Sequence, residues 1–256
     1  MSTDVSQWWT TAIIDMEPGK ISYRGEPVEQ AIAQKSFSQM IWHMVMGTPL
    51  AGHRARLFEA ALVSAVDHGP QAPSIAAARM AATCGVGLNN AIATGVNMLG
   101  DVHGGAGQQA IELFDQALGA DDLTAFVRDF RARKSKYLPG FGHRFHKPVD
   151  PRAPALMSLV DAAAAAGEID GKYQAVSKAL HKAIVQVTGH DLALNIDGAT
   201  AIIYAELGVP APLARGFFCL SRSVGILAHS WEQTQQGGRN KGPTPPQYRW
   251  AFEEKI

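Results

Sequence analysis

The chain has 256 residues, of which 46% are hydrophobic, and its 23 basic side chains are balanced by 23 acidic ones. A chain of this length and composition can bury one sizeable core, or one large and one small lobe. The formal net charge of zero favours neither nucleic acid nor an anionic membrane surface as a partner, so any anion-binding site must come from a local cluster of cations.

The N-terminal residues lack the basic start and long apolar run of a signal peptide, and no run of about 18 apolar residues predicts a membrane span. The two cysteines, Cys84 and Cys219, lie in apolar helical stretches without the spacing of metal ligands or of a disulfide framework. We therefore expect a cytoplasmic protein in which both cysteines are buried, small side chains.

Alternation of β-branched and polar residues occurs only near the N-terminus, over residues 10–16 and 20–25. This pattern predicts a small β-hairpin with Pro18 and Gly19 as its turn. Helical periodicity begins in residues 29–47, which we expect to form one helix with a broad apolar face. The residues predicted on that face are Ile32, Phe37, Met40, Ile41 and Met44.

Further helical patterns, separated by Gly and Pro stop signals, follow along the chain. They cover residues 52–69, 74–100 with a break near Gly85, 108–119, 123–134, 153–167, 173–189, 196–208 and 212–238. Residues 239–256 are Pro-rich and are expected to be extended, with a short helical turn near the end. The predicted fold class is all-α, with roughly ten helices in a single domain over residues 1–256.

Four junctions between predicted helices carry unusual polar residues next to glycines. These residues are Asp67 and His68, then Asp101 and His103, then His143, Arg144, His146 and Arg152, and finally Asn195 and Asp197. Each has an ordinary explanation, because a single histidine at a helix end usually caps the helix or faces solvent, and Asp197 suits an N-cap. Arg222, inside an apolar helix, can snorkel to solvent or pair with a carboxylate.

Taken together, the four junctions indicate a functional site. Histidines and a carboxylate beside several arginines suit proton transfer on a substrate that carries several carboxylates. His143 and His146 are three residues apart, but they lie in a Gly- and Pro-rich segment with no cysteine or carboxylate at ligand spacing. We therefore expect no metal site.

These motifs resemble those of the citrate synthase superfamily. They are similar, in the family's order, to the first catalytic-histidine loop, the signature around the second catalytic histidine, the segment with the catalytic aspartate and the helix with a carboxylate-binding arginine. The four segments are GDVHGGAGQQA (residues 100–110), PGFGHRFHKPVDPRA (139–153), NIDGATAIIYAELG (195–208) and LSRSVGILAH (220–229).

Within the superfamily, the chain most resembles citryl-CoA lyase and the C-terminal module of ATP citrate lyase. Residues 8–32 and 66–83 are similar to segments of those proteins, and the N-terminal helical part of a synthase is shortened. The resemblance implies an all-α, citrate synthase-like fold with a large lobe and a small lobe, the small lobe covering approximately residues 105–210. It also implies a homodimer with the active site near the subunit interface.

The resemblance implies catalytic roles for three residues. His143 would act on the tertiary hydroxyl of the substrate, His103 would donate a hydrogen bond to the thioester oxygen, and Asp197 would deliver a proton to the enolate carbon. The residues implied to bind the substrate carboxylates are His68, Arg152, Arg222 and, from the partner subunit, Arg239.

Coenzyme A would be part of the substrate and product rather than a permanently bound cofactor. The adenine and the pantetheine arm are expected to lie along Leu138, Pro139, Gly140, Phe141 and Gly142. The basic run just upstream is either a solvated helix face or a site for the coenzyme's phosphates. The residues assigned to the phosphates are Arg131, Arg133 and Lys147.

The implied reaction is the retro-Claisen cleavage of citryl-CoA, or a related 3-hydroxy-3-carboxyacyl-CoA, to acetyl-CoA and oxaloacetate. Three alternatives remain open. One is a small citrate or 2-methylcitrate synthase, because the same residues serve both directions. The second is a citramalyl-CoA or alkylcitryl-CoA lyase, and the third is a non-catalytic paralogue that binds an acyl-CoA.

Overall fold

The computed structural model describes residue 5 and residues 8–142 and 149–254 of the chain. Two of the predicted site residues, His143 and Lys147, lie outside these ranges. The described part contains eleven helices and three short strands, so the predicted all-α class is confirmed with a small N-terminal sheet attached. None of these helices is long and apolar enough to cross a membrane.

The N-terminal sheet consists of β1 (Ile14–Glu17), β2 (Lys20–Tyr23) and β3 (Glu26–Pro27), all antiparallel and in sequence order. β1 and β2 pair with Glu17 opposite Lys20, which leaves Pro18 and Gly19 as the two-residue turn. The predicted hairpin is therefore confirmed, and the structure adds the short third strand.

The next segment differs from the prediction, because residues 29–47 do not form one helix. They form most of α1 (Val28–Gln34) and all of α2 (Phe37–Met46), separated at Ser36. The Ser36 side chain accepts a hydrogen bond from the N–H of Gln39, and the Gln39 side chain accepts one from the N–H of Ser36. This capping box starts a new helix in a new direction. The proposed apolar face was consequently wrong at Ile32 and Phe37, which are 78% and 83% exposed, whereas Ile41 packs partly buried against the core, next to the fully buried Trp42.

The remaining helices agree with the predicted ones to within a few residues. They are α3 (Gly52–Ser64), α4 (Pro73–Thr83), α5 (Leu88–Asn97), α6 (Ala106–Leu118), α7 (Leu123–Arg133), α8 (Arg152–Ala165), α9 (Lys172–Thr188), α10 (Ile196–Glu206) and α11 (Ala211–Gln236).

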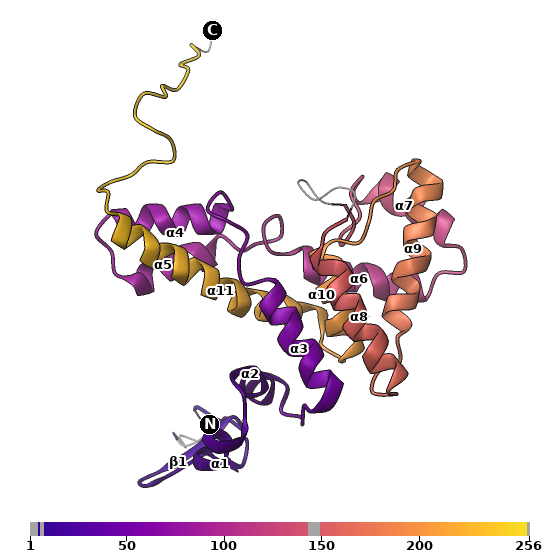
Figure 1. Cartoon of the computed structure of the whole chain (residues 1–256), viewed down its shortest axis with the longest axis horizontal. Coiled ribbons are helices and arrows are strands. Elements are labelled where there is room, and N and C mark those ends of the chain that lie inside the picture. The colour runs from indigo at the N-terminus through magenta and orange to yellow at the C-terminus, as the bar shows by residue number, and fades with distance from the viewer. Residues whose placement is uncertain (1–4, 6–7, 143–148, 255–256) are drawn as a thin grey trace.

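Two smaller expectations were wrong. Cys84 is exposed and Cys219 partly exposed, because Cys84 follows the last residue of α4 at a helix end and Cys219 lies on a partly open side of α11. Residues 237–254 contain no helical turn and extend away from the helices (Figure 1). Only the start of this tail is attached, by hydrogen bonds from the N–H groups of Asn240 and Lys241 to the Thr83 carbonyl and hydroxyl oxygens.

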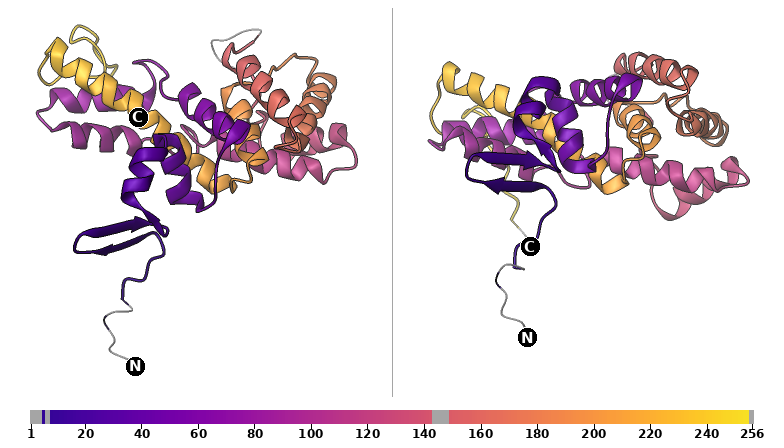
Figure 2. Two further views of the ribbon diagram at one scale, coloured as in Figure 1. Left: turned by 60° about the horizontal axis from the view of Figure 1, so that its bottom comes forward. Right: turned by 90° about the horizontal axis from the view of Figure 1, so that it is seen from below.

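Two hydrophobic clusters hold the helices together, and α11 belongs to both. In the larger cluster the rings of Trp42, Phe58 and Phe217 meet edge to face or stacked, with the Phe58 and Phe217 centroids 4.9 Å apart. The smaller cluster joins α4, α5 and α11 around Ile75 and Ile226. Figures 1 and 2 show α11 as the long helix that runs from the group of α6 to α10 to the pair α4 and α5. The small lobe over approximately residues 105–210 remains a prediction.

The end of α3 is fixed against the middle of α11. The last carbonyl groups of a helix have no partner within it and must be satisfied by other donors. Here α11 supplies three donors, with Ser221 Oγ bonding to Leu62 O, Arg222 Nε to Ala65 O at 3.0 Å, and the Gly225 N–H to Val66 O at 3.0 Å. The approach at residue 225 is so close that a Cβ there would overlap the Val66 carbonyl oxygen.

We predict that Gly225→Ala destabilises the protein by about 1–3 kcal/mol, because the added methyl forces α3 and α11 apart. Gly216→Ala on the same helix is the matched control, since a Cβ at residue 216 meets no atom within 4 Å. The control should be stabilised by about 0.5–1 kcal/mol, the usual gain for Ala over Gly in a helix. Urea denaturation at one protein concentration measures the free energy of unfolding of both variants. Equal changes in the two variants would contradict the close contact at residue 225.

Candidate active site

His103 lies in the loop between α5 and α6, and its ring contacts the start of α4. Its Nε2 atom is 3.2 Å from the backbone nitrogen of Ser74 and 2.9 Å from Ser74 Oγ. A backbone N–H can only donate, so Nε2 accepts and the ring proton lies on Nδ1. Burial lowers the pKa of His103, and the positive charge of Arg222 lowers it further. The ring is therefore a neutral imidazole with one N–H available as a donor.

The loop that carries His103 is itself held by residues that sequence analysis did not identify. Arg215 of α11 donates from Nη2 to Oδ1 of Asp101, and Gln109 Nε2 donates to the Asp101 carbonyl oxygen at 3.0 Å. Asp101 was noted in the sequence only as a junction residue. Its partner Arg215 lies 114 residues further along the chain, so no local pattern indicated the pair.

Arg222 is a buried cation whose terminal nitrogens face no acceptor among the described residues. Its side chain is 5% exposed, its Nε donates to Ala65 O, and its guanidinium carbon lies 4.8 Å from the centre of the Phe218 ring. Burial lowers the pKa of Arg222, and the carboxylates of Asp67 and Asp197 oppose that shift. A guanidinium group with two unused terminal nitrogens is suited to binding a ligand carboxylate through two hydrogen bonds.

Arg152 stands at the start of α8 and is oriented by Asp150, which sequence analysis also missed. Its Nε and Nη2 atoms donate to the two carboxylate oxygens of Asp150 at 3.0 and 2.8 Å. Asp150 is 2% exposed and the Arg152 side chain 24% exposed, so this two-point ion pair is shielded from water on its carboxylate side. The charge of Arg152 acts to lower the pKa values of both Arg222 and Asp197, so the three side chains are close enough to affect one another's ionisation.

Asp197 lies in the first turn of α10, but it is not the N-cap. Asn195 has that role, because its side-chain oxygen accepts a hydrogen bond from the N–H of Gly198 at 3.0 Å. The Asp197 carboxylate has no hydrogen-bond partner among the described residues. Burial raises the pKa of Asp197, and the charges of Arg222 and then Arg152 only partly oppose this rise. Such a carboxyl group holds a proton more readily than an exposed aspartate.

The loop before His143 is attached to the segment that leads into α10. The Gly142 N–H donates to Ala193 O at 2.8 Å, and the Asn195 N–H donates to Gly140 O at 3.0 Å. Asn195 also donates from Nδ2 to Gly142 O at 2.7 Å. The loop crosses α10 so closely that a Cβ on Gly198 would overlap the Gly140 carbonyl oxygen. This crossing fixes Leu138 to Gly142 beside the first turn of α10, where Asp197 stands.

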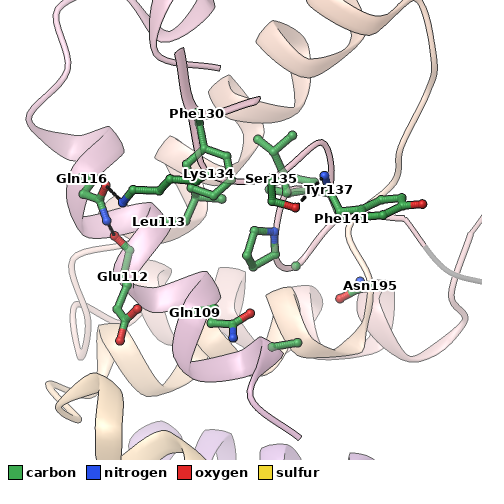
Figure 3. A pocket seen from close by; sticks show the side chains of 14 residues that line it. Gln109, Glu112, Leu113, Gln116, Phe130, Lys134, Ser135, Tyr137, Phe141 and Asn195 are labelled. Atoms are coloured by element: carbon green, nitrogen blue, oxygen red, sulfur yellow. Dashed lines mark hydrogen bonds between the residues drawn. The ribbon is translucent and has the colours of Figure 1, made fainter. Parts of the chain in front are cut away.

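A pocket of about 390 Å³ opens between α6, the end of α7 and this loop (Figure 3). Four residues predicted to contact coenzyme A line it, namely Leu138, Pro139, Gly140 and Phe141. Lys134, which belongs to the basic run proposed as one possible site for the coenzyme's phosphates, also lines the pocket. Its Nζ is 3.1 Å from Gln116 Oε1 and 5.7 Å from the centre of the Phe130 ring.

Two predicted phosphate partners lie outside the pocket lining. Arg131 and Arg133 are on the last turn of α7 but do not line the pocket, and Arg133 forms an exposed ion pair with Asp129 at 2.7 Å. Lys147 falls outside the described residues, as does His143, which directly follows Gly142 in the sequence.

The structure therefore brings some predicted site residues together and leaves others apart. His103, Arg222, Asp197 and Arg152 share one electrostatic neighbourhood, although the pocket itself reaches neither His103 nor Asp197. His68 is exposed next to Asp67 at the end of α3, and Arg239 is exposed on the C-terminal tail. Among the described residues, no group of three or more His, Cys, Asp or Glu side chains could hold a metal ion.

Comparisons with known proteins show the family to which this fold belongs. Residues 20–244 match the family model described as citrate synthase, C-terminal domain. The chain is 34% identical over 182 residues to a citrate synthase of Haloferax volcanii and 31% identical over 188 residues to citrate synthase 1 of Mycobacterium tuberculosis. These alignments cover 70% and 71% of this chain but 46% and 43% of the two synthases, so the chain spans about half the length of the curated relatives that it matches.

A solved structure of citryl-CoA lyase from Hydrogenobacter thermophilus superposes with a TM-score of 0.85 at 29% identity, over 97% of this chain and 96% of that one. An ATP citrate lyase from Methanothrix soehngenii, solved in complex with citrate and coenzyme A, superposes with a TM-score of 0.84 over 100% of this chain and 45% of that one. Its sequence identity to this chain is 21%, so the match shows the fold alone. Because the family model covers most of the sequence, the chain belongs to the citrate synthase family.

Proposed function

We propose that this chain is a citryl-CoA lyase, which cleaves citryl-CoA to acetyl-CoA and oxaloacetate. The observation that supports this most is the close superposition on the Hydrogenobacter thermophilus lyase, with a TM-score of 0.85 over nearly all of both chains. By contrast, a citrate synthase of Thermoplasma acidophilum superposes with a TM-score of 0.68 over 87% of this chain and 59% of the synthase. A citrate synthase of Thermotoga maritima covers 98% of this chain and 95% of that one but superposes with a TM-score of 0.59, so the closer superposition supports the lyase, not the shared length.

In the proposed reaction, His143 removes the proton of the tertiary hydroxyl, which becomes the ketone of oxaloacetate. The carbon–carbon bond next to that carbon breaks, and its electron pair forms the enolate of acetyl-CoA. The Nδ1–H of His103 donates to the thioester oxygen, where negative charge develops. Asp197 then delivers a proton to the enolate carbon, a role that its raised pKa favours.

The oxaloacetate carboxylates are proposed to bind at Arg222, Arg152 and His68. Arg222 offers two unused terminal nitrogens, whereas two of the three guanidinium nitrogens of Arg152 already bind Asp150. Arg239 is proposed to reach the site of a partner subunit. Coenzyme A is proposed to lie in the pocket along Leu138 to Phe141, with its phosphates toward Lys134 and the last turn of α7.

A homodimer is part of the same proposal. Leu220, Val224, Leu227 and Trp231 form a stripe along one face of α11 at helical spacing, and they are 48%, 57%, 42% and 55% exposed. The smaller hydrophobic cluster beside this helix contains only four buried residues. An exposed apolar stripe next to such a small core is the kind of surface that a second copy of the chain would cover.

The test is to offer citryl-CoA to the purified protein and to follow oxaloacetate with malate dehydrogenase and NADH. We expect oxaloacetate and acetyl-CoA in equal amounts. An alkylcitryl-CoA, followed with the same assay, and citramalyl-CoA, whose cleavage releases pyruvate and is followed with lactate dehydrogenase and NADH, serve as comparison substrates, and a preference for either would move the proposal to a related lyase. Absence of cleavage of all three would contradict it.

A small citrate synthase is the second candidate, because sequence relatives at 31% and 34% identity carry that name. A synthase also hydrolyses the citryl-CoA that it makes. Incubation with acetyl-CoA and oxaloacetate separates the two candidates, since a synthase releases free coenzyme A in amounts that follow citrate, and a lyase does not. Release of free thiol at a rate comparable to cleavage would favour the synthase.

Asp197→Asn should lower activity and raise stability. Loss of the proton donor should reduce turnover by about 10²-fold or more. Because the folded-state pKa of Asp197 is raised, its ionised form destabilises the fold at pH 7, and this cost disappears below the unfolded-state pKa of about 3.9. The melting temperature of the variant should therefore exceed that of the wild type at pH 7, by a difference that shrinks toward pH 4.

The matched control for this prediction is Asp122→Asn, at the N-cap of α7, where the side chain accepts hydrogen bonds from Thr124 and Ala125. Asparagine is as good an N-cap as aspartate, so activity and melting temperature should both stay close to wild type. A destabilised Asp197→Asn would show that this carboxylate is satisfied in the fold.

Lys134→Ala should raise the KM for the CoA substrate about fivefold, as expected for the loss of one charge-assisted contact to a phosphate, with little change in kcat. The control is Lys178→Ala, an exposed lysine of α9 that lies 3.9 Å from Asp161 and outside the pocket. Reversing the charges of Arg131 and Arg133 tests whether the phosphates extend to the end of α7. An unchanged KM in that double variant would remove both arginines from the site.

A further inference from the structure

A chain of hydrogen bonds outside the proposed site connects α4 and α11 to the end of α3. Arg79 of α4 donates from Nη1 to Glu232 at 2.6 Å and to Nδ1 of His229 at 3.0 Å, and from Nη2 to Gln236 at 2.8 Å. On the other side of the ring, His229 Nε2 lies 3.1 Å from Oδ1 of Asp67. None of these bonds is used by the proposed mechanism.

The geometry determines which groups donate. A guanidinium group has no acceptor, so His229 Nδ1 accepts from Arg79 and the ring proton lies on Nε2, from which it is donated to Asp67. The side chains of Arg79 and His229 are 15% and 18% exposed, so both bonds are partly shielded from water and constrain the ring at each nitrogen.

Asp67 is the residue through which this chain of bonds reaches the proposed site. Its Oδ2 accepts from the N–H of Gly69 at 3.0 Å, which closes a turn around His68. Burial alone would raise the pKa of Asp67, but the hydrogen bonds from Gly69, from His229 and from the N–H of His68 lower it. The carboxylate is therefore charged, and its charge acts on Arg222.

Asp67 thus stands between two residues that are proposed to bind the substrate carboxylates, His68 on the adjacent backbone and Arg222 on α11. It fits close to α11 because residue 225 is glycine, where an added Cβ would lie 2.9 Å from Asp67 Oδ1. A rotation of the Asp67 side chain would change both the turn around His68 and the field at Arg222.

We propose that Arg79 and His229 are positioning residues for dicarboxylate binding, which hold Asp67 so that His68 and Arg222 face the oxaloacetate half of the substrate. This inference rests on the proposed function. It predicts a selective effect, because coenzyme A is proposed to bind some distance away, in the pocket between α6 and α7, and has no contact with this chain of bonds.

The test uses the full-length protein and isothermal titration calorimetry with oxaloacetate and, separately, with coenzyme A. His229→Leu removes both ring hydrogen bonds at similar volume. We expect its Kd for oxaloacetate to rise about tenfold or more and its Kd for coenzyme A to stay within about twofold. His229→Gln, whose amide N–H can still donate to Asp67, should recover part of the oxaloacetate affinity.

The control is His53→Leu. His53 also bonds to a carboxylate, Glu168 at 2.7 Å, but it lies at the start of α3, at the opposite end from Asp67. Its loss should leave both Kd values unchanged. If His229→Leu does not fold, Arg79→Gln leaves the ring in place and provides the same comparison between the two ligands.

Three results would overturn the inference. An oxaloacetate Kd within about twofold of wild type in a folded variant would show that the chain of bonds does not affect the site. Equal weakening of oxaloacetate and coenzyme A would show a purely structural role. A wild-type protein that binds coenzyme A but no dicarboxylate would overturn the proposed function itself, and this inference with it.

Discussion

The hydrogen bonds between the last turn of α3 and the middle of α11 determine where the proposed site can form. They supply donors to the carbonyl groups of Leu62, Ala65 and Val66, and one of the three donors is the side chain of Arg222. The bond to the Ala65 carbonyl oxygen, directly after α3, therefore also orients the cation proposed to bind the substrate. Because the end of α3 also carries Asp67 and His68, a single helix contact brings two separate motifs of the sequence to one place.

A second close contact, between the loop Leu138 to Gly142 and the start of α10, brings the proposed coenzyme pocket and Asp197 together. The loop Leu138 to Gly142 is hydrogen-bonded to residues 193–195, and Gly140 crosses Gly198 with no room for a side chain. Asp197 is between Asn195 and Gly198, so its position relative to the coenzyme pocket is set by backbone contacts rather than by flexible side chains. Both contacts depend on glycine at the point of closest approach, Gly225 in the first and Gly140 with Gly198 in the second.

Local sequence patterns predicted the helices and the hairpin well, because periodicity, Gly and Pro stops and a two-residue turn are all local. The break at Ser36 was missed although its signal, Ser36 followed three residues later by Gln39, is present in the sequence. The partners that support the site could not be predicted. Arg79 and His229 are 150 residues apart, and Arg215 is 114 residues from Asp101, so only the packing of α11 against α4 and the His103 loop brings them together.

The same packing gives Arg222 two electrostatic functions before any ligand binds. Burial lowers the pKa of His103 and the charge of Arg222 lowers it further, which favours the neutral imidazole as a hydrogen-bond donor, and the same charge limits the rise that burial causes in the pKa of Asp197. A bound dicarboxylate would partly neutralise this cation, so both pKa values should then rise. The proton on Asp197 would become more strongly held when the substrate is in place, which is the state required of a group that protonates an enolate.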